Sequence, residues 1–189
     1  MAGIFMDKDL FLYFYALVPP EEIQSSVTMI KQDFKDRFKA GHALKSPPHI
    51  TLIPPFKFEK SNEGLLINSV NIFSKNESRF LQKLNGFGSF PPRVIFIKVN
   101  KNESLKRLYY RFLKYMDEIL QINSLVRGSK KFSPHMTVAF RDLTRENYYM
   151  AQPEYEKKNI FFEFEIDGIC LLRHNRKHWE IIHKSQFDH

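Results

Sequence analysis

Two short segments of the sequence carry the same pair of chemically useful side chains. Residues 48–52 read PHITL and residues 134–138 read PHMTV. Alternate residues of a β-strand point to the same face, so His49 shares a face with Thr51, and His135 with Thr137. Imidazole can give or take a proton near neutral pH because its unperturbed pKa is roughly 6.5. The four side chains could therefore supply a base, an acid and hydroxyl donors to a phosphate group.

A histidine followed at the second position by Ser or Thr arises easily by chance, as residues 183–185 (HKS) show. That segment lacks the preceding proline and the apolar frame of the other two. For His49 alone, an ordinary packed histidine would be the better interpretation. Two matching copies at equivalent places in the chain favour a functional site.

The two motifs lie at equivalent places because the chain repeats the order strand, helix, His-containing strand. Apolar spacing predicts strands and helices of similar length in both copies. The first copy comprises residues 10–18, 21–39 and 48–53, and the second comprises residues 93–99, 104–120 and 134–140. Gly41 and Gly128 are the expected helix stops, and Pro54-Pro55 is expected to close the first motif strand.

Each copy is followed by a further helix and strand. We expect helices at 62–75 and 144–152, the second stopped near Pro153, strands at 79–90 and 160–172, and a closing strand at 179–184. Asn85-Gly86 and Asp167-Gly168 are turn or bulge signals. This order predicts an α+β protein, residues 1–189 forming one domain of two pseudo-symmetric lobes. Each lobe would be an antiparallel sheet with helices on its outer face, and the motif strands would meet at a shared central cleft.

Composition adds an expectation about partners and compartment. The net charge is +8 and aromatic residues make up 15%, which favours an anionic partner such as RNA, although a basic soluble protein would look the same. The lone Cys170 excludes an internal disulfide and fits a reducing, cytoplasmic setting. Residues 10–18 follow acidic rather than basic residues and predict a buried strand, not a signal peptide. We expect a monomer with no membrane span.

The paired motifs resemble those of the 2H phosphoesterase superfamily, which includes 2′-5′ RNA ligase-like proteins and RNA 2′,3′-cyclic phosphodiesterases. The resemblance rests on YFYALVPP (13–20), PPHITLIPPF (47–56) and SPHMTVAFRD (133–142). It implies in-line attack between two histidines with no cofactor and no metal. We assign His135 as the base and His49 as the acid. In many bacterial relatives Arg directly follows the small residue of the second motif, whereas here Phe140 stands there and Arg141 follows.

Strand alternation and position suggest seven further residues that bind substrate. Tyr13 and Tyr15 share one face of the first strand, and Lys98 could hold phosphate. The full set of candidates is Tyr13, Tyr15, Lys98, Phe56, Phe140, Arg141 and Lys45. Packing or solvation would account for each of them equally simply.

Two other clusters and two other functions compete with this interpretation. His174, His178 and His183 suggest a metal site, but no carboxylate or cysteine pattern completes it. The basic residues of 101–114 fit an exposed helix face as well as an RNA contact. A non-catalytic module that binds RNA ends or nucleotide phosphates is the main alternative to a phosphodiesterase. A purely structural domain would explain the repeat but not the recurrence of His and Thr.

Overall fold

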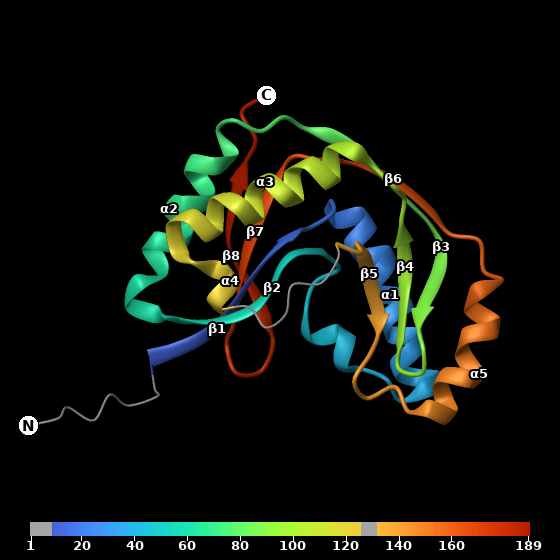
Figure 1. Cartoon of the computed structure of the whole chain (residues 1–189). Helices are drawn as coiled ribbons and strands as arrows, with labels where there is room; N and C mark the ends of the chain where they lie inside the picture. Colours follow the sequence, from blue (N-terminus) through green and yellow to red (C-terminus); the bar gives the residue numbers. More distant parts are fainter. Residues whose placement is uncertain (1–8, 126–131) are drawn as a thin grey trace, which may run out of the picture.

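The computed structural model describes residues 9–125 and 132–189, whose strands form two four-stranded sheets (Figure 1). Sheet A has the order β2-β1-β7-β8 and sheet B the order β5-β4-β3-β6. All neighbouring strands are antiparallel. The strands are β1 (Leu10–Leu17), β2 (Ile50–Glu59), β3 (Phe80–Phe90), β4 (Val94–Val99), β5 (His135–Ala139), β6 (Phe161–Ile166), β7 (Gly168–His174) and β8 (Trp179–Gln186). The predicted α+β class with two antiparallel sheets is confirmed.

Helices cover one face of each sheet. The described helices are α1 (Glu21–Phe38), η2 (His42–Lys45), η3 (Lys60–Asn62), α2 (Glu63–Ser74), α3 (Glu103–Leu120), α4 (Ile122–Leu125) and α5 (Arg145–Glu156). Helices α2 and α3 pack on sheet A, where the Phe112 ring of α3 lies 5.1 Å from the Tyr15 ring of β1. Helices α1 and α5 pack on sheet B, and the Phe34 and Tyr155 rings stack at 4.2 Å. The other face of each sheet is called its inner face below.

The two repeat units exchange elements. Helix α1 follows the first strand of sheet A but packs against β5 of sheet B, whereas α3 follows β4 of sheet B and packs against β2 of sheet A. Strands are exchanged as well. β3 comes from the first half of the chain and joins sheet B beside β4, whereas β7 comes from the second half and joins sheet A beside β1. Each sheet is therefore completed and covered by segments from both halves of the chain.

The first motif strand runs through Pro54-Pro55, contrary to the prediction that the prolines would end it. The pairing of β1 with β2 shifts twice, between Tyr13 and Tyr15 and between Tyr15 and Ala16. β2 is an edge strand of sheet A. Bulges on an edge strand accommodate proline because its missing N–H falls outside the ladder.

Two other boundaries differ from the sequence prediction, whereas α3 ends at the predicted residue. The expected strand 160–172 is divided at Asp167, and its two parts, β6 and β7, belong to different sheets. A side chain at Gly168 would place Cβ 2.3 Å from the Ser185 carbonyl oxygen, so the crossing point requires glycine. Helix α5 continues past Pro153 to Glu156. Helix α3 ends at Leu120, capped by Gln121 at φ 51, and the expected stop Gly128 lies outside the described residues.

Helix α1 follows a strand of sheet A but packs on sheet B, so we predict that its buried face stabilises the whole protein. Phe34 has no exposed surface and stacks on Tyr155 of α5, so Phe34→Ala leaves a cavity under sheet B. We expect the free energy of unfolding to fall by about 3–5 kcal/mol, measured by urea denaturation. Met29→Ala on the same helix removes a side chain that is 68% exposed and should change it by about 0.5 kcal/mol at most. Equal losses in both variants would contradict the packing described for α1.

Candidate functional site

The two motif strands occupy neighbouring edges of the two sheets. β2 is the edge strand of sheet A, β5 is the edge strand of sheet B, and the two strands contact each other. His49, Thr51, His135 and Thr137 are half-buried, whereas the residues that alternate with them are buried against the helices: Ile50, Leu52, Met136 and Val138. Each strand is therefore apolar on its helix side and carries His and Thr on the inner face.

Both motif histidines make the same hydrogen bond to the backbone. His49 Nδ1 lies 2.7 Å from the carbonyl oxygen of Pro47, and His135 Nδ1 lies 2.8 Å from that of Ser133. A carbonyl oxygen can only accept, so Nδ1 carries the proton and donates in both rings. The Nε2 atom of each ring is thereby left to exchange a proton with another molecule. Local backbone geometry thus selects one tautomer at both positions.

A phenylalanine on the adjacent strand packs against each histidine ring. The Phe14 ring lies 4.9 Å from His49 at an interplanar angle of 47°, and the Phe96 ring lies 5.1 Å from His135 at 51°. Phe90 of β3 adds an edge contact to His135 at 5.0 Å. These contacts restrict rotation of both imidazoles.

The surroundings of His49 favour its neutral form. Burial is the main cause that lowers the pKa of His49, to about 4, although the residue as a whole is only half-buried. The hydrogen bond to Pro47 opposes this shift, while the positive charges of Lys31 and protonated His135 lower the pKa further. Because the charge of His135 affects the pKa of His49, the two imidazoles lie within electrostatic range of each other. His49 is therefore unprotonated at neutral pH.

Lys31 is a buried cation behind His49 that the sequence analysis did not identify. Its side chain is 2% exposed and Nζ donates to the carbonyl oxygen of Ser46 at 2.9 Å. Burial lowers the pKa of Lys31 to about 7, and within the described residues no carboxylate forms an ion pair with it. By binding the Ser46 carbonyl, Lys31 fixes the backbone segment that precedes His49. The next carbonyl in that segment, that of Pro47, accepts the hydrogen bond from His49 Nδ1. Its position among the apolar residues of α1, four after Val27 and three before Phe34, was the signal available in the sequence.

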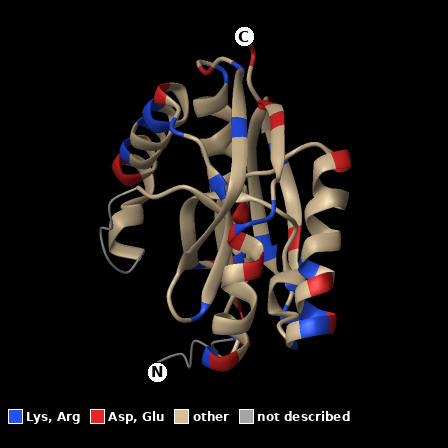
Figure 2. Ribbon diagram, turned by 90° about the vertical axis from the view of Figure 1, so that its right-hand side faces the viewer, with Lys and Arg blue, Asp and Glu red and all other residues tan. Residues whose placement is uncertain are grey.

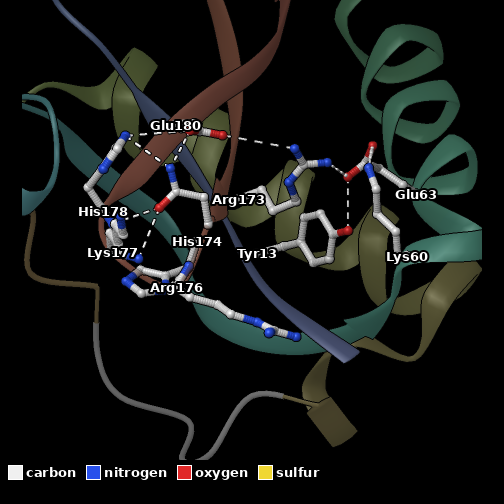
Figure 3. Close-up of polar contacts among 10 residues, drawn as sticks. Tyr13, Lys60, Glu63, Arg173, His174, Arg176, Lys177, His178 and Glu180 are labelled. Carbon is white, nitrogen blue, oxygen red and sulfur yellow. Dashed lines mark hydrogen bonds and ion pairs between the residues drawn. The ribbon is translucent and has the colours of Figure 1, made fainter. Parts of the chain in front are cut away.

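Three of the predicted substrate-binding residues lie in the core instead. Tyr13 and Tyr15 have no exposed surface, and Phe56 stacks on Tyr15 with ring centroids 6.1 Å apart. The Tyr13 hydroxyl donates to Glu63 of α2, which also accepts from Arg173 (Figure 3). The two tyrosines share a face of β1, as predicted, but the prediction that this face binds substrate is wrong. Helices α2 and α3 cover that face, and Phe14 lies on the inner face.

The other four candidates fall in two places. Lys98 is paired with His135 across β4 and β5, is exposed, and lies on the same face as Phe96, as strand alternation predicted. Phe140, Arg141 and Lys45 lie beyond the ends of the motif strands, beside His42. The Phe140 ring contacts the His42 ring edge-on at 5.0 Å, and Arg141 Nη1 donates to His42 Nε2 at 3.3 Å.

The competing clusters have ordinary surroundings. His183 Nε2 contacts Asn71 Oδ1 of α2 at 2.6 Å, whereas His178 pairs with Glu180 at the turn of the same β7–β8 hairpin. Over residues 9–125 and 132–189, no three His, Cys, Asp or Glu side chains gather in a way that could hold a metal. Three basic residues of α3, namely Lys106, Arg111 and Lys114, pair with carboxylates, as Arg111 does with Glu77 at 3.0 Å, and Figure 2 shows both charges interspersed along the helices. In the same ranges no helix is long and apolar enough to cross a membrane.

Comparison with known proteins agrees with this fold and identifies the family. Residues 19–178 match the family model described as the 2′-5′ RNA ligase superfamily, and the chain belongs to this superfamily. A Geobacillus sp. (strain WCH70) protein named "Putative phosphoesterase" is 28% identical over 165 residues, which cover 85% of this chain and 86% of that protein. The family resemblance predicted from the sequence is confirmed, and the chain is a phosphoesterase-family protein.

Solved structures share the fold at low sequence identity. TT0787 of Thermus thermophilus has a TM-score of 0.67 and 20% identity, covering 94% of this chain and 100% of that one. Escherichia coli LigT in complex with 3′-AMP has a TM-score of 0.67 and 14% identity, covering 96% and 100%. At these identities the likeness concerns the fold.

The environment of His49 predicts a measurable titration. Below pH about 4 the ring is protonated and above it the ring is neutral, so NMR should find the neutral Nδ1–H form across pH 5.5–8. Lys31→Met removes a nearby positive charge and should raise the pKa of His49. Lys35→Met, on the exposed side of the same helix, should leave it where it is. A wild-type His49 that titrates near 6.5 would contradict the described burial.

Proposed function

We propose that the protein is a phosphodiesterase that hydrolyses RNA 2′,3′-cyclic phosphates or related 2′-5′ or cyclic phosphodiesters by acid/base catalysis between His49 and His135. The observation that carries the proposal is the matched Nδ1–carbonyl hydrogen bond, which leaves Nε2 of both histidines available on contacting strands. Two oriented imidazoles with opposite proton tasks are what an in-line displacement at phosphorus requires.

The two histidines differ in a way that suggests their roles. His49, with a pKa of about 4, is neutral at physiological pH and can take a proton from water. The oxygen of that water forms a bond to phosphorus while the bond to one ribose oxygen breaks, and protonated His135 delivers a proton to that oxygen. The product is a phosphomonoester, and one proton has moved from water to His49 and one from His135 to the leaving oxygen. This assignment reverses the one favoured from the sequence, which made His135 the base.

Hydroxyl and ammonium groups nearby could stabilise charge on the phosphate oxygens. Within the described residues neither the Thr51 nor the Thr137 hydroxyl has a hydrogen-bond partner, so both are free to donate. Lys98, exposed and paired with His135 in the sheet, adds a positive charge on the same face. Preorganised donors of this kind lower the barrier because charge builds up on the transferring phosphoryl group. Acid, base and charge stabilisation all come from side chains, so the mechanism proposed here has no step that needs a metal.

The relatives support the reaction class. The family is described as the 2′-5′ RNA ligase superfamily, the curated relatives are named as phosphoesterases, and the LigT structure holds 3′-AMP. A protein that only grips phosphate would need donors but no base and acid. Both histidines are present and each is held in a defined tautomer, which favours catalysis over a module that only binds RNA ends or nucleotide phosphates.

Replacement of the histidines tests the mechanism. His49→Ala and His135→Ala should each lower kcat by about 10²–10⁴-fold on a substrate with a 2′,3′-cyclic phosphate, because each removes one proton-transfer partner. The double variant should be little worse than the poorer single variant, since residues that act as a unit are non-additive. Wild-type kcat should follow a bell-shaped pH profile. Undiminished hydrolysis by a folded double variant would dismiss both roles.

Thr51→Val and Thr137→Val serve as finer variants of the same site. Valine keeps the β-branched shape suited to a strand and removes only the hydroxyl. We expect reduced turnover with unchanged thermal melts, which separates charge stabilisation from folding.

Metal independence is a separate prediction. Hydrolysis should persist at an unchanged rate in excess EDTA, assayed in parallel on an RNA 2′,3′-cyclic end, a 2′-5′ oligonucleotide and a small cyclic nucleotide. Loss of activity in chelator that a divalent ion restores would show that the proton-transfer mechanism is incomplete.

A further inference from the structure

Beyond the ends of the motif strands, three chain segments bring basic side chains together. The cationic cluster consists of His42 and Lys45 of η2, Arg141 after β5, and His174 at the end of β7. Arg141 Nη1 lies 3.3 Å from His42 Nε2. The charges of Lys45 and Arg141 both help to lower the pKa values of His42 and His174, after burial, which places all four within electrostatic range. The cluster thus joins both sheets at one end of the site.

The cluster has an excess of positive charge. Over the described residues neither Lys45 nor Arg141 forms an ion pair with a carboxylate, unlike Lys106, Arg111 and Lys114 of α3. Of the described carboxylates, Asp142 is the one that affects the pKa of His42, and its Oδ2 accepts from the His42 backbone N–H at 2.8 Å. His178, when protonated, is a further positive charge that faces His174. In this part of the described chain, two cations are therefore left without a partner of opposite charge.

The neutral histidines of the cluster add hydrogen-bond donors. Arginine can only donate, so His42 Nε2 accepts from Arg141 and its proton lies on Nδ1. His174 Nδ1 accepts from the backbone N–H of Arg176 at 3.1 Å, so its proton lies on Nε2. Two cations and two imidazole N–H groups form a set of donors, which suits the oxygens of a phosphate.

The parts that present these groups are held in place. Arg141 has φ 60, and the Asp142 N–H closes the turn by donating to the Phe140 carbonyl at 2.8 Å. The β7–β8 hairpin that carries His174 is fixed by Asn175, whose Oδ1 accepts from the backbone N–H groups of Lys177 and His178. Next to the turn, Arg173 bridges Glu63 and Glu180 (Figure 3). Little ordering would be required when an anion binds.

The cluster is continuous with the candidate site. His49 follows Lys45 by four positions in the chain, so their backbones are at most roughly 14 Å apart. On the inner face of sheet A, a row of ring contacts leads from His49 through Phe14 and Trp179 to His174, with centroid separations of 4.9, 4.6 and 5.0 Å. Trp179 is half-buried, so its ring keeps some surface on which a base could stack.

We propose that Lys45, Arg141 and His174 form a second phosphate subsite, which takes a phosphodiester of the same single-stranded oligonucleotide whose terminal phosphate reacts between His49 and His135. The inference rests on the proposed function and narrows its substrate class to chains of more than one nucleotide. Arginine gives such a site a planar, two-pronged grip on phosphate, and lysine adds a point charge.

The test compares substrates of two lengths. Uridine 2′,3′-cyclic phosphate offers only the reacting phosphate, whereas a tetranucleotide with a 2′,3′-cyclic end also offers phosphodiesters. We expect Lys45→Gln and Arg141→Gln each to lower kcat/KM for the tetranucleotide on the order of tenfold more than for the mononucleotide. The paired variant Lys75→Gln with Arg107→Gln removes two exposed charges from the helix side of sheet A and should leave this ratio at its wild-type value. Equal losses on both substrates, or none on either, would overturn the subsite.

A binding measurement separates this inference from the catalytic proposal. Fluorescence anisotropy with a labelled single-stranded tetranucleotide that lacks the cyclic end needs no turnover. The slope of log affinity against log salt concentration should become shallower by about one for each cation removed from the cluster, and not for the control pair. If wild-type protein hydrolyses neither substrate but these slopes change as expected, the catalytic proposal fails and the subsite stands. Unchanged slopes would refute the subsite whatever the activity.

Discussion

Neither half of the chain can complete its own sheet, and this mutual dependence determines where the helices and the two motif strands lie. The hydrophobic side of sheet B is covered by α1 from the first half, and that of sheet A by α3 from the second. The crossing of β3 and β7 ties the sheets together in the same way. Because the first half covers β5 and the second covers β2, burial of apolar surface brings the two motif strands into contact. The pairing of the two histidines is thus a consequence of core packing.

The site combines a shared local device with unequal surroundings. Both histidines donate Nδ1–H to the carbonyl two residues before them, and each packs on a phenylalanine at nearly the same distance and tilt. Lys31 lies behind His49, and its ammonium donates to the carbonyl that precedes Pro47. Buried positive charge and desolvation both favour neutral imidazole there. A pseudo-symmetric fold can in this way place two copies of one motif in different surroundings.

Sequence reasoning worked where the deciding physics is local. The period-2 alternation of a strand put His49 and Thr51 on one face, and the same alternation put His135 and Thr137 on one face. Helical spacing gave α1, α2 and α3 to within a residue or two of their observed bounds. Pro54-Pro55 and Pro153 were misleading because an edge strand with bulges and an exposed helical turn tolerate what a central element would not. The net charge of +8 was uninformative about the cationic cluster, because it counts Lys45 and Arg141 together with the paired cations of α3.

That two equivalent strands each carry a histidine and a threonine on a common face can be read from the residues alone, since it follows from chain geometry and an internal repeat. Which face of β1 the helices cover depends on packing in three dimensions, and this packing places Tyr13 and Tyr15 in the core and Phe14 against His49. It also divides residues 160–172 between two sheets and sets Lys31 behind one histidine but not the other. These outcomes depend on contacts between segments far apart in the chain, which no local pattern of residues encodes.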